Sequence, residues 1–94
     1  MESNNTEERL NRLREQLNEF HDWPSAFTFK FILPACEVRE AELKEIFAGA
    51  KEVRKRPSAK GNYWAFTITE VLEGPDQVFA RYTAASAIRD ILSM

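Results

Sequence analysis

Cysteine and histidine are almost absent from this 94-residue sequence, which has one of each, Cys36 and His21. A lone cysteine excludes a disulfide within the chain, and with nothing to suggest secretion it is typical of a reducing compartment. Neither residue has partners at ligand spacing, so we expect no metal site, and nothing else in the sequence implies a cofactor. The three glycines, Gly49, Gly61 and Gly74, stand too far apart for a phosphate-cradling loop.

Long hydrophobic runs are also missing. No apolar segment approaches the roughly 18 residues that span a bilayer. The first residues are polar and acidic, without the basic start and apolar stretch of a signal peptide. We therefore expect a cytoplasmic protein with no membrane partner. The formal charge of -2 provides no global field that would attract nucleic acid.

Groups suited to catalysis are equally scarce. Cys36 precedes a predicted helix, but no histidine lies near it in the sequence to act as a base. The glutamates of the predicted helices are indistinguishable from solvated surface carboxylates. The sequence therefore predicts no catalytic residue and no enzyme activity.

Residues 1–22 are predicted to form a tail and an amphipathic helix. Met1–Asn5 would be a loose tail, and Pro24 would stop the helix. Apolar residues recur along it at steps of three and four: Leu10, Leu13, Leu17 and Phe20. This spacing predicts one apolar stripe, which we expect to dock on the rest of the domain.

Residues 23–94 are predicted to form a single α+β domain, with 44% apolar and 30% charged residues in the whole chain. Strands are expected at Phe27–Leu33, Glu52–Arg56 and Tyr63–Val71, and helices at Glu37–Phe47 and from Pro75. Periodicity leaves Ile88–Leu92 open between helix and strand. The order is that of a ferredoxin-like β-α-β-β-α-β two-layer sandwich, with an extra N-terminal helix.

The strand alternation predicts which face of this sheet is buried. The apolar face, which we expect the two helices to cover, consists of Phe27, Phe29, Phe31, Leu33, Trp64, Phe66 and Ile68. The other face is neither strongly polar nor strongly apolar, and it carries Thr28, Lys30, Tyr63, Ala65, Thr67 and Thr69. The leading helix or a second copy of the chain could cover part of it, so the sequence allows a monomer or a homodimer.

Two segments resemble a known family. Trp23-Pro24-Ser25-Ala26-Phe27-Thr28-Phe29-Lys30 is similar to its opening motif, and Arg56-Pro57-Ser58-Ala59-Lys60-Gly61-Asn62-Tyr63 to its central signature. This is the YbeD-like family of small bacterial proteins, a domain of unknown function, and the likeness spans about Phe20 to Met94. The resemblance implies a sheet similar to ACT-type regulatory domains and a strand at Ile88–Leu92. It implies no established catalytic activity and no known cofactor.

The loop Pro57–Tyr63 is the candidate binding site. Arg54, Lys55, Arg56 and Lys60 make it basic within an acidic chain. A glycine can adopt a positive φ that aims backbone N–H groups at an anion. The residues expected to contact a partner or ligand are Arg56, Ser58, Lys60, Gly61, Asn62 and Tyr63. The alternative is a well-made hairpin with no binding role, in which Gly61 and Asn62 serve the turn.

Three functions are compatible with these features. The first is a non-enzymatic regulatory or adaptor domain that binds a partner protein or a small anionic ligand through this hairpin. The second is single-stranded RNA binding on the sheet face, because the segment 60–66 echoes the third strand of RNA-recognition motifs. However, Asn62 stands where the first stacking aromatic belongs, and the acidic balance disfavours nucleic acid. The third is an ACT-like module that senses an amino acid between paired copies.

Overall fold

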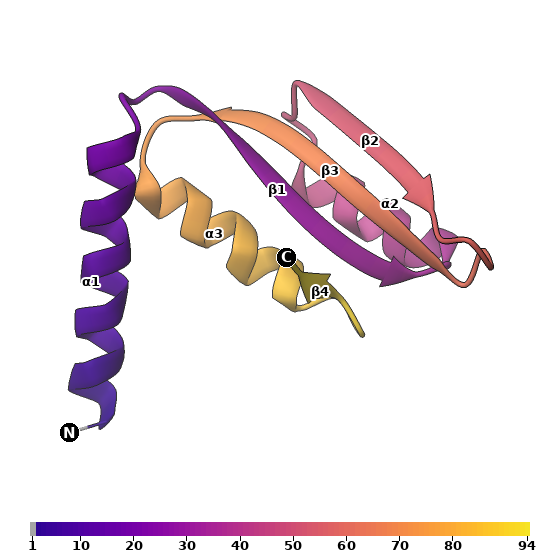
Figure 1. The fold of residues 1–94 in the computed structure, drawn as a ribbon, viewed down its shortest axis with the longest axis horizontal. Helices are drawn as coiled ribbons and strands as arrows, with labels where there is room; N and C mark the ends of the chain where they lie inside the picture. The colour runs from indigo at the N-terminus through magenta and orange to yellow at the C-terminus, as the bar shows by residue number, and fades with distance from the viewer. Residues whose placement is uncertain (1) are drawn as a thin grey trace.

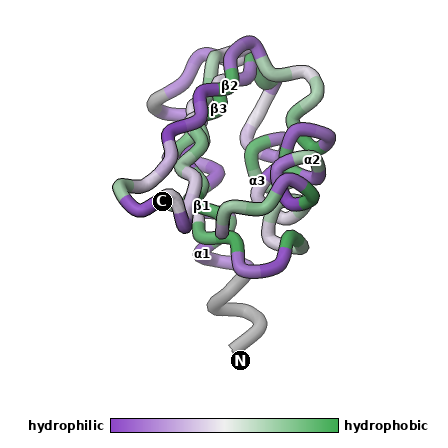
Figure 2. The backbone as a smooth tube through the Cα atoms, turned by 90° about the vertical axis from the view of Figure 1, so that its right-hand side faces the viewer, coloured by the Kyte–Doolittle hydropathy of each residue, from purple (hydrophilic) through white to green (hydrophobic). Residues whose placement is uncertain are grey.

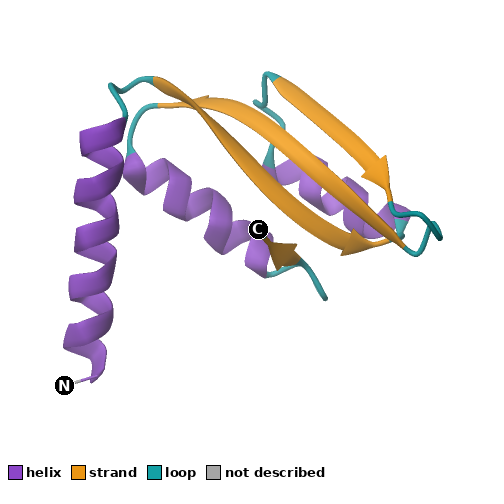
Figure 3. Ribbon diagram, in the orientation of Figure 1, coloured by secondary structure: helices purple, strands orange, loops and turns teal. Residues whose placement is uncertain are grey.

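The structure, a computed structural model, describes the backbone of residues 2–94 and the side chains of residues 7–19 and 21–94. The chain is of the α+β class, with three helices and a four-stranded antiparallel sheet (Figures 1 and 3). The elements are α1 (Glu2–Phe20), β1 (Ser25–Pro34), α2 (Glu37–Ile46), β2 (Glu52–Pro57), β3 (Tyr63–Leu72), α3 (Pro75–Ser86) and β4 (Leu92–Ser93).

The strand order in the sheet is β2-β3-β1-β4. The two central strands, β1 and β3, pair over ten residues, from Ser25 opposite Leu72 to Pro34 opposite Tyr63. β3 therefore lies between β1 and β2, the two strands that α2 connects. β2 is an edge strand, and its lysine, its arginines and Pro57 discourage pairing with other chains. Its hydrophilic colouring is visible in Figure 2.

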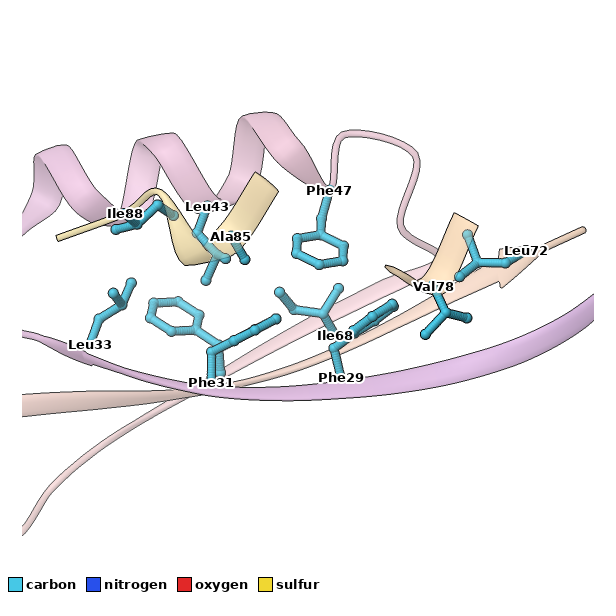
Figure 4. Packing of buried hydrophobic residues seen from close by; sticks show 11 residues of the cluster. Phe29, Phe31, Leu33, Leu43, Phe47, Ile68, Leu72, Val78, Ala85 and Ile88 are labelled. Carbon is cyan, nitrogen blue, oxygen red and sulfur yellow. The ribbon is translucent and has the colours of Figure 1, made fainter. Parts of the chain in front are cut away.

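The core lies between one face of the sheet and the helices α2 and α3 (Figure 4). Alternate side chains of β1 and β3 fill it, because successive residues of a strand point to opposite faces. The fully or almost fully buried members are Phe29, Phe31, Leu33, Leu43, Phe47, Phe66, Ile68, Leu72, Val78, Ala85 and Ile88. Leu43 belongs to α2, and Val78 and Ala85 to α3. The predicted burial of the phenylalanine face is thus confirmed.

Aromatic rings join the sheet to both helices. The ring centroid of Phe29 lies 4.9 Å from that of Phe47, at the end of α2, and 5.0 Å from that of Tyr82 on α3. It also lies 4.8 Å from Phe27, its neighbour on the same face of β1. Each tilted or edge-on aromatic pair adds about 0.5–1.5 kcal/mol beyond the burial of its surface. Phe29 therefore holds three elements together.

One carboxylate interrupts the apolar face of β3. Glu70 is only 5% exposed. The Arg81 guanidinium on α3 donates to both of its oxygens, from Nε at 2.8 Å and from Nη2 at 3.1 Å. This hydrogen bonding raises the pKa of Arg81 above its ordinary value. A Cβ added at Gly49 would stand 3.1 Å from Glu70 Oε2, so the loop after α2 passes close over the ion pair.

The N-terminal predictions are partly wrong. α1 begins at Glu2, so the expected tail of residues 1–5 is wrong at residues 2–5, and Met1 lies outside the described residues. Leu17 packs against the core, but Leu10 and Leu13 are 43% and 48% exposed, and the side chain of Phe20 is not among those described. A 19-residue helix is about 28 Å long and extends beyond the surface beside it (Figure 1).

Arg14 connects α1 to α3 through an ion pair and a cation–π contact. Arg14 Nη2 lies 2.9 Å from Asp76 Oδ1. The Cζ atom of the same guanidinium group lies 5.8 Å from the centroid of the Phe79 ring. The predicted docking of the apolar stripe is therefore limited to its C-terminal part.

The C-terminal strand is much shorter than the family resemblance implied. Only Leu92 and Ser93 form β4, opposite Ile32 and Phe31, whereas residues 87–90 form a turn. Ile88 is buried in the core from this turn. The chain therefore fills the core before it reaches the sheet edge, which leaves two residues to pair with β1.

No helix within residues 2–94 is both long enough and apolar enough to cross a membrane.

Candidate functional site: the β2–β3 hairpin and the open face of the sheet

The hairpin between β2 and β3 projects from the end of the sheet farthest from α1 (Figures 1 and 3). Every residue from Pro57 to Tyr63 is exposed. The candidate binding loop is therefore on the surface.

Hydrogen bonds fix the shape of this loop. The Ser58 N–H donates to the Tyr63 carbonyl at 2.8 Å, and the Tyr63 N–H lies 3.2 Å from Ser58 Oγ, which accepts. The Gly61 N–H donates to the Ser58 carbonyl at 2.9 Å. Gly61 has a φ of 76°, the left-handed conformation that was expected of it. Ser58 and Gly61 thus shape the turn.

The loop is also tied to the end of β1. The Ala35 N–H donates to the Asn62 carbonyl at 2.9 Å, so the backbone of Asn62 makes this contact. Tyr63 begins β3 and is 51% exposed. It shares the open face with Arg56, because Arg56 pairs with Ala65 two residues along β3. Lys60 lies in the turn itself, between the two strands. The predicted residues therefore divide into a turn and a sheet face.

The cross-strand register places cations in two rows on the open face. Lys30 on β1 and Arg54 on β2 both pair with Thr67 of β3. In the next row, Arg56 pairs with Ala65. The result is a shallow groove of about 650 Å³, lined by Lys30, Arg54, Lys55, Arg56, Ala65, Thr67 and Met94. Small side chains of β3 form its floor, and long cationic side chains stand on both sides.

Lys55 directs its charge to the other side of the sheet. Its ammonium lies 3.0 Å from Glu40 Oε2 on α2 and 4.0 Å from the centroid of the Trp64 ring. Trp64 packs against the core, and the next residue on its face, Phe66, is buried. The two central aromatics of β3 therefore face the helices.

The cations of the groove differ in their partners. Arg54 pairs with Glu52, two residues earlier in β2 and on the same face. The ion pairs formed by the described side chains include neither Lys30 nor Arg56. The groove therefore carries an excess of positive charge. Beyond the groove, the hydroxyls of Thr28 and Thr69 lie 3.2 Å apart.

Sequence reasoning missed this groove as a site. It grouped the basic residues of segment 54–56 by their position in the chain and placed Lys30 on the outer face without a role. The missing information was the register, which sets Lys30 and Arg54 opposite the same threonine. Successive residues of a strand point to opposite faces, so the sequence alone could have placed Lys55 on the face opposite to Arg54 and Arg56.

His21 and Cys36 lie in surroundings that are typical of structural residues. His21 Nδ1 lies 3.2 Å from Ser25 Oγ, and its ring centroid is 5.2 Å from that of Trp23. Cys36 is a partly buried free thiol at the N-cap of α2. Across the described side chains, no three of His, Cys, Asp or Glu gather closely enough to hold a metal ion.

Comparisons with known proteins identify a family without an assigned function. A family model described as "Protein of unknown function (DUF493)" matches residues 18–94. No curated protein and no solved structure matches the chain. The matched region contains the whole sheet, both covering helices and the end of α1.

Proposed function

We propose, on the premise that the chain belongs to the DUF493 family of proteins of unknown function, that it is a cytoplasmic, non-enzymatic adaptor or regulatory domain. It binds an anionic partner, either a protein or a small ligand, through the β2–β3 hairpin and the adjoining open face of the sheet. The exposed, hydrogen-bonded hairpin is the observation that supports this role, together with the absence of Arg56 and Lys60 from the ion pairs of the described side chains. Ordered surface loops on a rigid scaffold are common binding elements.

We also infer a finer fold assignment. The β1-α2-β2 unit with β3 inserted between its strands, and β4 beside β1, supports a ferredoxin-like arrangement. The YbeD-like identity, the bacterial origin and the ACT-like character rest on the two sequence motifs. In this assignment the chain acts as a monomer or a homodimer.

An anionic protein or small ligand fits the surface better than RNA does. Single-stranded RNA recognition needs aromatic rings on which bases stack. Trp64 and Phe66 face the helices instead, and Tyr63 lies at the very end of the open face. Arginine and lysine on a bare sheet face favour charge-assisted hydrogen bonds to carboxylate or phosphate oxygens.

A double variant of the hairpin tests the proposal. Lys60→Ala/Tyr63→Ala removes the charge of the loop and the exposed ring beside it, and we expect the tagged full chain to lose its bound partners in capture from cells followed by mass spectrometry. The matched control is Val38→Ala/Lys44→Ala, which removes an exposed apolar residue and an exposed cation from α2. An unchanged partner set with the fold intact would refute the role of the hairpin.

A titration separates the RNA alternative. The full chain is added to short fluorescent single-stranded RNA at low salt, where phosphate contacts are strongest. The proposal expects no binding at micromolar protein. Saturable binding that Arg56→Gln abolishes would replace the proposed partner by RNA.

A further inference from the structure

We propose that the groove on the open face of the sheet is a binding site for a phosphate monoester. This inference rests on the proposed function, because it names the anionic chemistry that part of the same surface recognises. It concerns Lys30, Arg54 and Arg56 around Thr67, and not the hairpin tip.

The register brings three cations to one place. Adjacent strands are about 4.8 Å apart, so the Cα atoms of Lys30 and Arg54 stand about 10 Å apart on either side of Thr67. Arg54 and Arg56 are about 7 Å apart along β2. All three side chains line the groove. Their long, flexible stems allow all three charged ends to approach one anion above Thr67.

The charge balance favours a dianion with several oxygens. Glu52 is the acid on the same face of β2, and it is paired with Arg54. Lys30 and Arg56 are left uncompensated by the described side chains. A phosphate monoester carries about -1.5 to -2 at neutral pH and three strong acceptor oxygens. A carboxylate offers one charge and two oxygens, which engage fewer of these donors.

The floor of the groove suits close approach. Ala65 and Thr67 are small, and Thr67 adds a hydroxyl that can donate to a phosphate oxygen. Arginine forks match phosphate geometry with two parallel hydrogen bonds, and lysine acts as a point charge beside them. The volume of about 650 Å³ lies within the range of small-molecule sites. A phosphorylated side chain of a partner protein would present the same group.

The test is a titration of the 15N-labelled full chain followed by amide shifts. The probes are ribose 5-phosphate and a phosphoserine peptide, each compared with its unphosphorylated counterpart at constant ionic strength. We expect saturable shifts at Lys30, Arg54, Arg56 and Thr67 with phosphorylated probes only. Saturation by both probes indicates a small phosphate ester as a sufficient ligand, and saturation by the peptide alone indicates a phosphorylated protein.

Variants of equal charge change locate the site. Lys30→Gln should weaken binding about tenfold, the loss expected for one charge-assisted hydrogen bond. Arg56→Gln should weaken it at least as much, and Lys44→Gln, at an exposed lysine of α2 outside the groove, should leave it unchanged. Absence of saturable shifts, or equal weakening by Lys30→Gln and Lys44→Gln, would overturn the inference. The proposed function is judged separately, by partner capture with the Lys60→Ala/Tyr63→Ala variant.

Discussion

At the scale of single residues, Phe29 makes the densest set of aromatic contacts in the core. It is fully buried and packs against β1, the end of α2 and α3. Phe29→Ala should lower the free energy of unfolding by about 3–5 kcal/mol, because both burial and packing are lost. Urea denaturation measures this, with Val38→Ala at an exposed position as the control that changes stability by less than about 0.5 kcal/mol. Similar values for the two variants would contradict the packing described.

The buried Glu70 forms an ion pair with the partly exposed Arg81. Glu70→Gln keeps the shape of the side chain but removes the charge that Arg81 contacts at both oxygens. We expect a loss of about 1–3 kcal/mol in the free energy of unfolding. The loss stays below that of a fully buried pair, because the Arg81 side chain is partly exposed. The exposed Glu52→Gln is the matched control for urea unfolding, and an equal effect of both substitutions would show that burial of the pair is unimportant.

Tyr82 makes stability sensitive to alkaline pH. Burial raises the pKa of its hydroxyl above the value near 10 of the unfolded chain. Between the unfolded and the folded pKa, the unfolded chain has lost the proton that the folded chain keeps, so this contribution to stability falls as pH rises. Unfolding of wild type and Tyr82→Phe at about pH 8 and at about pH 11 should therefore show the wild type losing stability relative to the variant. A constant difference between the two proteins would argue against this linkage.

At the scale of elements, the hairpin depends on one backbone conformation. Gly61 has a φ of 76°, and a Cβ there would meet no atom within 4 Å, so a substitution acts through the backbone alone. Gly61→Ala should cost about 1–2 kcal/mol for the left-handed conformation. Lys60→Ala in the same loop has no positive φ to strain and should be nearly neutral. If urea unfolding gave both variants the stability of the wild type, the loop would not need this conformation.

The elements with strong periodicity were predictable from the sequence. Phe29, Phe31 and Leu33 alternate with polar residues, and that pattern allows only one face to be buried. Glu70 was not predicted to pair with Arg81, because the contact joins β3 to α3 and depends on how the helix crosses the sheet. The predictions for the two chain ends were partly wrong because they too depend on how an element lies against the rest of the fold. Leu10 and Leu13 have the spacing of a docked stripe, but the surface beside α1 is too short to cover them.

The candidate site was predicted only in part. The sequence identified the exposed turn around Gly61 and the local excess of positive charge, because both depend on neighbouring residues. It did not join Lys30 to Arg54, which are 24 positions apart in the chain. Their proximity follows from the pairing of β1, β2 and β3 with Thr67 in the middle. Such a contact is set by register, which no local pattern contains.

At the scale of the whole molecule, charge is strongly segregated. Residues 51–63 contain five cations and one acid, a net charge of +4, whereas the whole chain carries -2. The remaining residues therefore carry -6. At an ionic strength of about 0.1 M, charges more than about 10 Å apart are largely screened. A binding partner therefore experiences the local charge of the hairpin and the sheet face rather than the net charge.

This segregation predicts retention on a cation exchanger despite the net negative charge. At neutral pH and low salt, the wild type should bind a sulfonate matrix and elute as salt screens the contact. Arg54→Gln/Arg56→Gln removes two charges from the groove and should elute at clearly lower salt. Arg9→Gln/Arg12→Gln changes the net charge equally on α1, where glutamates surround the arginines, and should elute close to wild type. Equal shifts of the two double variants would show that net charge decides retention, and that the open face of the sheet provides no focused positive surface.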